Sequence, residues 1–173
     1  MITRERGLAL TLRFADCVPV MYHDPVRQVI GIAHAGWPGI VAGVLPATIL
    51  AMRDHCGCDP RDVRACIGPS IGPDWFEVGD DVAHKIQSAV SESVISQPTG
   101  VLKPHVDLWR AAESQLRDVG VKHIETARIC TASNTSEWFS HRAEKGKTGR
   151  FGAVIELPVA GEKHGIQTAS VYA

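Results

Sequence analysis

The sequence lacks a net charge of either sign and any long apolar run. Its 18 Lys and Arg residues balance 19 Asp and Glu residues to a formal charge of -1. No basic field is therefore available to hold nucleic acid or an anionic membrane. No apolar run approaches the roughly 18 residues of a membrane-spanning helix, and the charged start, residues 1–6, is unlike a signal peptide. These absences predict a cytoplasmic protein without nucleic-acid or membrane partners.

Several enzyme motifs and frameworks are also missing. There is no Walker loop, no G-x-G-x-x-G and no G-x-S-x-G, so nucleotide-triphosphate, dinucleotide and serine-hydrolase chemistry have no support. The five cysteines are odd in number and irregular in spacing, which argues against a disulfide framework. No repeat or linker divides the 173 residues. We expect a single domain over residues 1–173, with a tail over 161–173 whose structure the sequence does not indicate.

The sequence does contain apolar strands that alternate with three helices. Strands are predicted over residues 8–14, 18–22, 28–33, 62–67, 124–130 and 151–157, with a turn at His23-Asp24-Pro25. Helices are predicted over 38–55 (interrupted by Pro46), 80–90 and 108–119, and surface loops over 91–105 and 131–149. Asp107 is the expected N-cap and Gly120 the expected stop of the last helix. The alternation predicts one mixed α/β (α+β) domain.

Reactive side chains gather where these strands end. Cys17 follows the first strand, and His34 stands where another strand meets a helix. Strand ends that meet in space can form a thiolate–imidazole pair or offer two ligands to a soft metal site, where a catalytic zinc needs a third. The spacing is not that of a zinc finger. On spacing alone, the simpler interpretation is that Cys17 is a buried thiol and that His34 caps a helix.

Two further loop residues are candidates for substrate binding. The planar guanidinium of Arg142, in a polar loop, suits phosphate or carboxylate, although a surface arginine is an equally simple interpretation. Trp37 can stack on a planar base, or else belong to the core.

Six motifs in one order are more specific than any of these residues alone. They are Ala15-Asp16-Cys17-Val18-Pro19-Val20, Gly31-Ile32-Ala33-His34-Ala35-Gly36-Trp37, Ile67-Gly68-Pro69-Ser70-Ile71-Gly72-Pro73, Val106-Asp107-Leu108-Trp109, Phe139-Ser140-His141-Arg142 and Thr148-Gly149-Arg150-Phe151. From about residue 8 to 157 the series resembles the YfiH family, also called purine nucleoside phosphorylase, laccase-domain or polyphenol oxidase proteins.

The resemblance implies a fold, a metal and a reaction. The fold is an α/β/β/α sandwich, shared distantly with cytotoxic necrotizing factor deamidases. The metal is a catalytic zinc bound by His, Cys and His, of which two ligands fall on Cys17 and His34. The reaction is phosphorolysis of adenosine, inosine, guanosine or methylthioadenosine, with adenosine deamination, so that nucleoside and phosphate are the expected partners. In this interpretation Asp16 orients His34 or transfers a proton, and Arg142 holds phosphate.

The chain departs from the family pattern at the metal site. The first family ligand is a histidine well upstream of Cys17, and the 16 residues before Cys17 contain no histidine. We expect either that an N-terminal segment is missing or that the protein uses two of its own ligands. Family members described as copper-dependent polyphenol oxidases provide one alternative, although eight histidines without an H-x-H pair suit multicopper chemistry poorly. A metal-free Cys–His hydrolase or deamidase is another alternative, and a non-catalytic binding protein a third. The oligomeric state is not indicated.

Overall fold

The computed structural model describes residues 1–97, 100, 102–159 and 170–172, and two facing sheets form its centre. The larger sheet has the order β1 (Ile2–Thr3), β4 (Val29–Ala35), β3 (Val18–Asp24), β5 (Arg64–Ile67) and β8 (His123–Thr126). The smaller sheet has the order β10 (Ser170–Tyr172), β9 (Phe151–Ile155) and β2 (Leu10–Phe14). Every pairing in these sheets is antiparallel except β5 with β8, which is parallel.

The central hairpin of the larger sheet extends further than the sequence suggested. Strands β3 and β4 pair from Val18 opposite Ala35 to Asp24 opposite Val29. The Asp24 carboxylate closes the turn by accepting hydrogen bonds from the N–H groups of Val26 and Arg27, each at 2.8 Å. The prediction that His23 belongs to the turn is therefore wrong, because His23 lies within β3 and pairs across the sheet.

The predicted helix over residues 38–55 is two helices, α1 (Trp37–Val41) and α2 (Val44–Cys56). The break falls at Gly43, whose φ of 69° suits a residue without a Cβ, and not at Pro46. Pro46 lies in the first turn of α2, where a missing N–H leaves no intrahelical hydrogen bond unmade. The other helices are α3 (Asp80–Gln87) and α4 (Leu108–Asp118), close to the predicted ranges.

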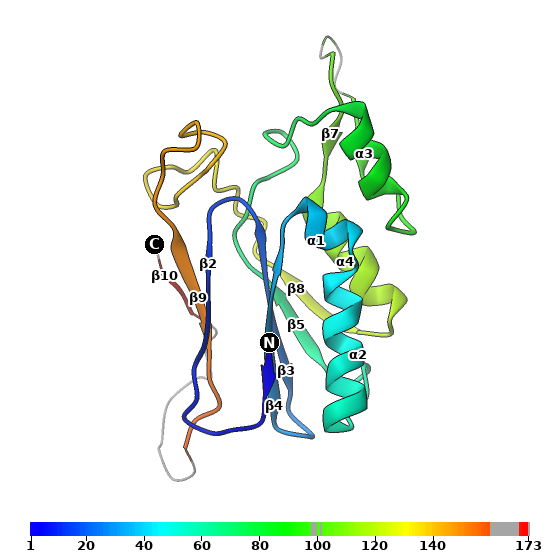
Figure 1. Ribbon diagram of the computed structural model, residues 1–173, viewed down its shortest axis with the longest axis vertical. Helices are drawn as coiled ribbons and strands as arrows, with labels where there is room; N and C mark the ends of the chain where they lie inside the picture. Colours follow the sequence, from blue (N-terminus) through cyan, green and yellow to red (C-terminus); the bar gives the residue numbers. More distant parts are fainter. Residues whose placement is uncertain (98–99, 101, 160–169, 173) are drawn as a thin grey trace.

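Two apolar cores lie on opposite faces of the larger sheet. Alternation along β3 sends Val18, Val20 and Tyr22 into a core shared with the helices, while Met21 enters a second core between the two sheets. Figure 1 shows the helices on one side of the larger sheet and β2, β9 and β10 on the other. The described residues thus form three layers, helices, sheet and sheet, and show no helix outside the smaller sheet. None of their helices has the length and apolar character needed to cross a membrane.

Three loop and strand predictions need correction. Residues 91–105 are not only a surface loop, because they contain β6 (Ile95–Ser96), which pairs with β7 (His105–Val106). The predicted strand over residues 124–130 is β8 and ends at Thr126. Of the tail over residues 161–173, Ser170–Tyr172 form β10 on the edge of the smaller sheet, and the rest lies outside the described residues.

Candidate functional site

Strand register places the Cys17 and His34 side chains on one face of the larger sheet. His34 lies directly opposite Pro19, and directly opposed residues of an antiparallel pair point the same way. Cys17 precedes Pro19 by two residues, so alternation returns its side chain to that same face. The thiol and the imidazole are therefore diagonal neighbours at the end of the β3–β4 hairpin, as the sequence predicted for residues at neighbouring strand ends.

Gly36 leaves the space that the Cys17 thiol occupies. A Cβ added at Gly36 would lie 2.9 Å from the Cys17 sulfur, closer than such atoms approach one another. The backbone of Gly36 is extended, with φ −68° and ψ 171°, and does not itself require glycine. The glycine at position 36 is thus explained by the thiol across the strand pair.

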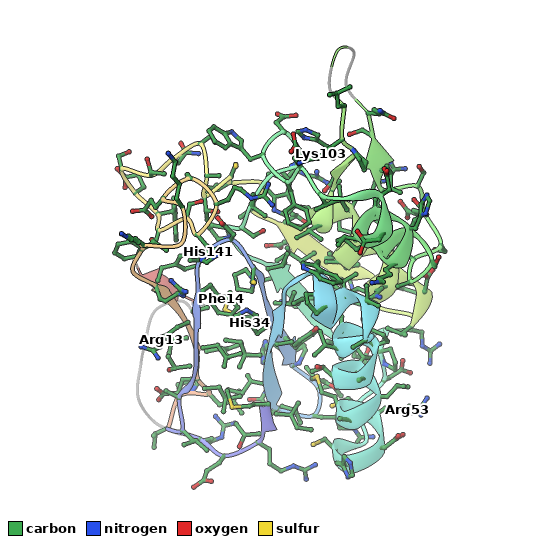
Figure 2. All side chains as sticks on the ribbon, turned by 45° about the horizontal axis from the view of Figure 1, so that its top comes forward. Arg13, Phe14, His34, Arg53, Lys103 and His141 are labelled. Carbon is green, nitrogen blue, oxygen red and sulfur yellow. The ribbon has the colours of Figure 1, made fainter. Side chains whose placement is uncertain are left out.

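The His34 imidazole packs on an aromatic ring from the smaller sheet. The ring centroids of His34 and Phe14 are 4.6 Å apart with an interplanar angle of 25°, and Figure 2 shows the two side chains next to one another. Phe14 in turn lies opposite Phe151 of β9, at a centroid distance of 5.9 Å. Burial lowers the pKa of His34, so the neutral imidazole, the form that binds metals, predominates at neutral pH.

The environment of Cys17 favours the protonated thiol. Burial raises the pKa of Cys17, the Asp16 carboxylate raises it further, and the Arg150 guanidinium lowers it. A nucleophilic cysteine usually has a lowered pKa that supplies thiolate at neutral pH. The described surroundings therefore do not activate Cys17 as a nucleophile by themselves.

Asp16 joins three loops at this end of the molecule. Its carboxylate accepts hydrogen bonds from the Thr131 hydroxyl and from the Arg142 backbone N–H, both at 2.7 Å, and its backbone carbonyl accepts one from Ile71. With both carboxylate oxygens engaged in this way, the structure shows Asp16 positioning the loops. The expected contact from Asp16 to His34 is not among its hydrogen bonds to described residues.

Arg142 and Trp37 are both held by protein contacts. The Arg142 guanidinium donates to the carbonyls of Trp75 (3.1 Å) and Glu77 (2.9 Å) and lies 5.5 Å from the ring centroid of Phe76. Trp37 begins α1 and packs, half-buried, against the helix-side core. The structure thus assigns Arg142 to joining two loops and directs Trp37 toward the helical layer, away from the face that carries His34.

Arg150 is a basic residue at this end of the molecule for which the sequence predicted no role. Its guanidinium is exposed, donates to the carbonyls of Thr148 (3.2 Å) and Gly149 (2.7 Å), and acts electrostatically on Cys17. No ion pair to a described residue engages it. The motif Thr148-Gly149-Arg150-Phe151 was the available signal, but nothing in the sequence showed that it reaches Cys17.

The donors present match zinc in kind but not in number. A thiol and an imidazole are the ligands that zinc prefers, and a catalytic site uses three protein ligands. Within the described ranges, no group of three or more His, Cys, Asp or Glu residues is placed to hold a metal ion. Cys17 and His34 alone therefore do not make a complete zinc site.

Two sheets face one another and helices cover the larger one, so the protein is a mixed α/β protein. Its candidate active site, with Cys17 and His34, lies at the end of the β3–β4 hairpin. A family model described as "Multi-copper polyphenol oxidoreductase laccase" matches residues 1–158, and the chain belongs to this family. The predicted relationship to the YfiH family is confirmed by this match together with the relatives and solved structures described next.

Similar proteins bear enzyme names. The chain is 42% identical over 157 residues to "Purine nucleoside phosphorylase" of Bacteroides thetaiotaomicron, covering 87% of this chain and 57% of that protein. It is 35% identical over 161 residues to "Purine nucleoside phosphorylase YlmD" of Bacillus subtilis, covering 91% and 58%. The chain therefore spans less than two thirds of the length of these relatives.

Solved structures confirm the mixed α/β fold. The crystal structure of the hypothetical protein YfiH of Bacillus licheniformis matches with a TM-score of 0.85 and 36% identity, covering 90% of this chain and 60% of that one. YlmD of Geobacillus stearothermophilus matches with a TM-score of 0.85 and 33% identity, covering 91% and 60%.

Proposed function

We propose that this chain carries the site of a purine nucleoside phosphorylase. The observation that supports this most directly is the convergence of Cys17, His34 and Arg150 at one end of the sheets, in a chain whose relatives bear that enzyme's name. In phosphorolysis a phosphate oxygen bonds to C1′ of the ribose as the bond from C1′ to the purine nitrogen breaks. The purine leaves with a proton, and ribose 1-phosphate is the second product.

Arg150 is the residue that we propose to hold phosphate. Its NH1 group is fixed by carbonyls of its own loop, which orients the guanidinium and reduces the entropy lost when an anion binds. Arg142, the candidate favoured from the sequence, donates instead to the carbonyls of Trp75 and Glu77. We therefore assign phosphate binding to Arg150 and loop positioning to Arg142.

Zinc is part of the proposal as the metal held by Cys17 and His34. A third donor must then come from outside the described residues: from another segment of the chain, from a partner or from the substrate. The test is metal content per chain by plasma mass spectrometry on protein purified without added metal. About one zinc that is lost in both Cys17→Ser and His34→Ala supports the assignment, and an unchanged metal content in these variants contradicts it.

The substrates proposed are adenosine, inosine, guanosine and methylthioadenosine, in the cytoplasm, with deamination of adenosine as a second reaction at the same site. The metal-free Cys–His alternative is less favoured because burial raises the pKa of the Cys17 thiol. The copper oxidase alternative is less favoured because the eight histidines include no H-x-H pair, and no group of three or more His, Cys, Asp or Glu residues in the described ranges is placed to hold a metal ion.

The deciding experiment measures adenine and ribose 1-phosphate released from adenosine and phosphate, by chromatography. We expect His34→Ala to lower adenine release by at least about 100-fold, since removing even indirect supports of a metal site costs 10- to 100-fold. We expect Arg150→Gln to raise the KM for phosphate by roughly tenfold or more, because a charge-assisted hydrogen bond contributes about 1.5–3 kcal/mol.

The matched control is Arg53→Gln. Arg53 lies on α2, far from the site in Figure 2, and pairs with Asp54 on the surface. Its substitution should leave both kinetic constants unchanged. Adenine release that is unaffected in His34→Ala would refute the proposed function. A phosphate KM that rises in Arg142→Gln but not in Arg150→Gln would reassign the phosphate site.

A further inference from the structure

A cavity opens between the two sheets, away from Cys17 and His34. It is a cavity of about 650 Å³ whose floor is formed by β3, β5 and β8 and whose opposite wall is formed by residues 155–157. Figure 1 shows β5 and β8 on the helix-bearing sheet, facing the side where β9 lies. Met21 and His23 line the cavity four and six residues along the chain from Cys17, a separation of roughly 13–20 Å along a strand.

Strand register aligns three basic side chains across the floor of this cavity. His23 of β3 lies directly opposite Arg64 of β5, and Arg64 lies beside His123 of β8. Residues in register on neighbouring strands share a face, with Cβ atoms about 4.5–5.5 Å apart in antiparallel pairs. Lys122 also lines the cavity, and its ammonium acts electrostatically on Asp59.

Two acids, Glu125 and Glu156, also line the cavity, but within the described part of the chain neither forms an ion pair with the basic row. No ion pair or hydrogen bond to a described residue engages the Arg64 guanidinium, and the buried Nε2 of His23 has no hydrogen-bond partner in the described part of the chain. Glu125 lies one row away, beside Cys66. Glu156 is exposed between the buried Ile155 and Leu157, so alternation directs its side chain away from the sheets' interior.

The Arg64 guanidinium without an ion-pair partner and the unsatisfied Nε2 of His23 leave hydrogen-bonding groups at the cavity floor that an anion would engage. Burial lowers the pKa of His23, and the neighbouring Arg64 lowers it further, while Asp24 raises it. The cavity wall also includes the apolar side chains of Met21, Ile155 and Leu157. A ligand that suits both parts carries a negative group and an apolar body.

We propose that this inter-sheet cavity is a second ligand site, separate from the Cys17–His34 site, and that it binds a small organic anion. The carboxylate or phosphate of the ligand bonds to Arg64, between His23 and His123, and its apolar body packs on Met21, Ile155 and Leu157. A volume of about 650 Å³ lies within the usual range of roughly 300–1,000 Å³ for small-molecule sites.

The test is a fluorescence titration of the full chain with 8-anilinonaphthalene-1-sulfonate, an aromatic organic anion. We expect one saturable site per chain, with affinity that falls as salt is added. Arg64→Gln should weaken binding by at least tenfold, Arg64→Lys should retain most of it, and Arg53→Gln, on the far side of the helical layer, should not change it. The uncharged probe N-phenyl-1-naphthylamine should bind all four proteins equally and weakly.

Competition identifies the anionic group. Displacement of the probe by octanoate indicates a carboxylate ligand, and displacement by phenyl phosphate indicates a phosphate ester, and either supports the proposal. Probe binding that is unchanged in Arg64→Gln would overturn it, as would equal affinity for the uncharged probe, since both would mean that an uncovered apolar sheet face binds the dye. Adenine release should be unchanged in Arg64→Gln, so this test is independent of the proposed function.

Discussion

At the scale of single residues, Asp16 combines an unusual backbone with an unusual set of partners. Its φ of 78° lies in the left-handed region, which Asp and Asn tolerate better than other non-glycine residues. That conformation turns the chain sharply between β2 and β3 and points the carboxylate at Thr131 and the backbone of Arg142. One side chain thus fixes the entrance of β3 against the long loop that precedes β9.

We expect Asp16→Ala to lower the free energy of unfolding by about 2–4 kcal/mol, because the buried Thr131 hydroxyl and the partly buried Arg142 N–H lose their charged acceptor. Asp16→Asn keeps the tolerance for positive φ and one acceptor, so its loss should be smaller, roughly 1–2 kcal/mol. Urea unfolding of the two variants measures the difference. Equal losses in the two variants would contradict this account, because they would show that neither the acceptor nor the tolerance for positive φ that asparagine retains contributes to stability.

Gly36 gives a prediction that separates activity from stability. Gly36→Ala forces the Cys17 sulfur to move because the new Cβ would lie 2.9 Å away, while the extended backbone accepts alanine. Phosphorolysis should fall by about tenfold or more, since small misplacements in a site are costly, and stability should change by less than about 1 kcal/mol. Gly152→Ala, whose Cβ would meet nothing within 4 Å, is the matched control.

Contacts between residues close in the chain could be predicted from the sequence, whereas contacts between distant loops could not. Cys17 and His34 were predictable as neighbours because both stand at the ends of strands that are adjacent in the chain. The partners of Asp16 were not, because Thr131 and Arg142 are 115 and 126 residues away and lie in a loop without periodic pattern. Arg150 escaped notice for the same reason.

At the scale of elements, local signals predicted some boundaries well and misplaced others. Asp107 caps α4 as expected, and its carboxylate accepts a hydrogen bond from the Arg110 N–H at 2.9 Å. Gly120, with φ 95°, follows the end of that helix as predicted. The predicted break at Pro46 was wrong because the sequence does not show whether a proline lies in the first turn of a helix or in its interior. Only the structure shows that Gly43 is the N-cap of a new helix, which places Pro46 in the first turn.

The cap of α4 can be tested directly. Asp107→Ala should lower the free energy of unfolding by about 1 kcal/mol, because the N–H of Arg110 loses its acceptor. Asp80→Ala, at the start of α3, is the comparison, since the N-cap of that helix is Gly79 and makes no side-chain hydrogen bond. Its effect should be a few tenths of a kcal/mol. Similar losses for both variants in urea unfolding would contradict the assigned cap.

At the scale of the whole molecule, the stability should depend on pH through His23. Burial lowers the pKa of His23, with a further contribution from Arg64. The unfolded chain, with an ordinary histidine pKa near 6.5, then binds more protons than the folded protein as the pH falls through that value. Stability contributed by neutral His23 is therefore full above about pH 6.5 and is lost at lower pH.

The measurement is the urea midpoint between pH 7.5 and 5.5, a window above the titration of carboxylates such as Asp59, whose pKa Arg61 lowers to about 2. The midpoint should fall with pH, and the dependence should be weaker in His23→Gln. His84→Gln, on the exposed side of α3, serves as the surface control. An identical slope in His23→Gln and the unchanged protein would remove His23 from this explanation.

The pairing of β2 with β9 has a consequence for how the protein is made. Leu10 pairs with Ile155 and Phe14 with Phe151, so β2 finds its partner only after the whole segment between the two strands has been synthesised. At about 5–20 residues per second, β2 waits on the order of 10 s on the ribosome. During that interval the β3–β4 hairpin and its helices can already pack, while the apolar face toward the smaller sheet stays open to solvent. A chaperone that shields this face during synthesis should therefore raise the yield of folded chain.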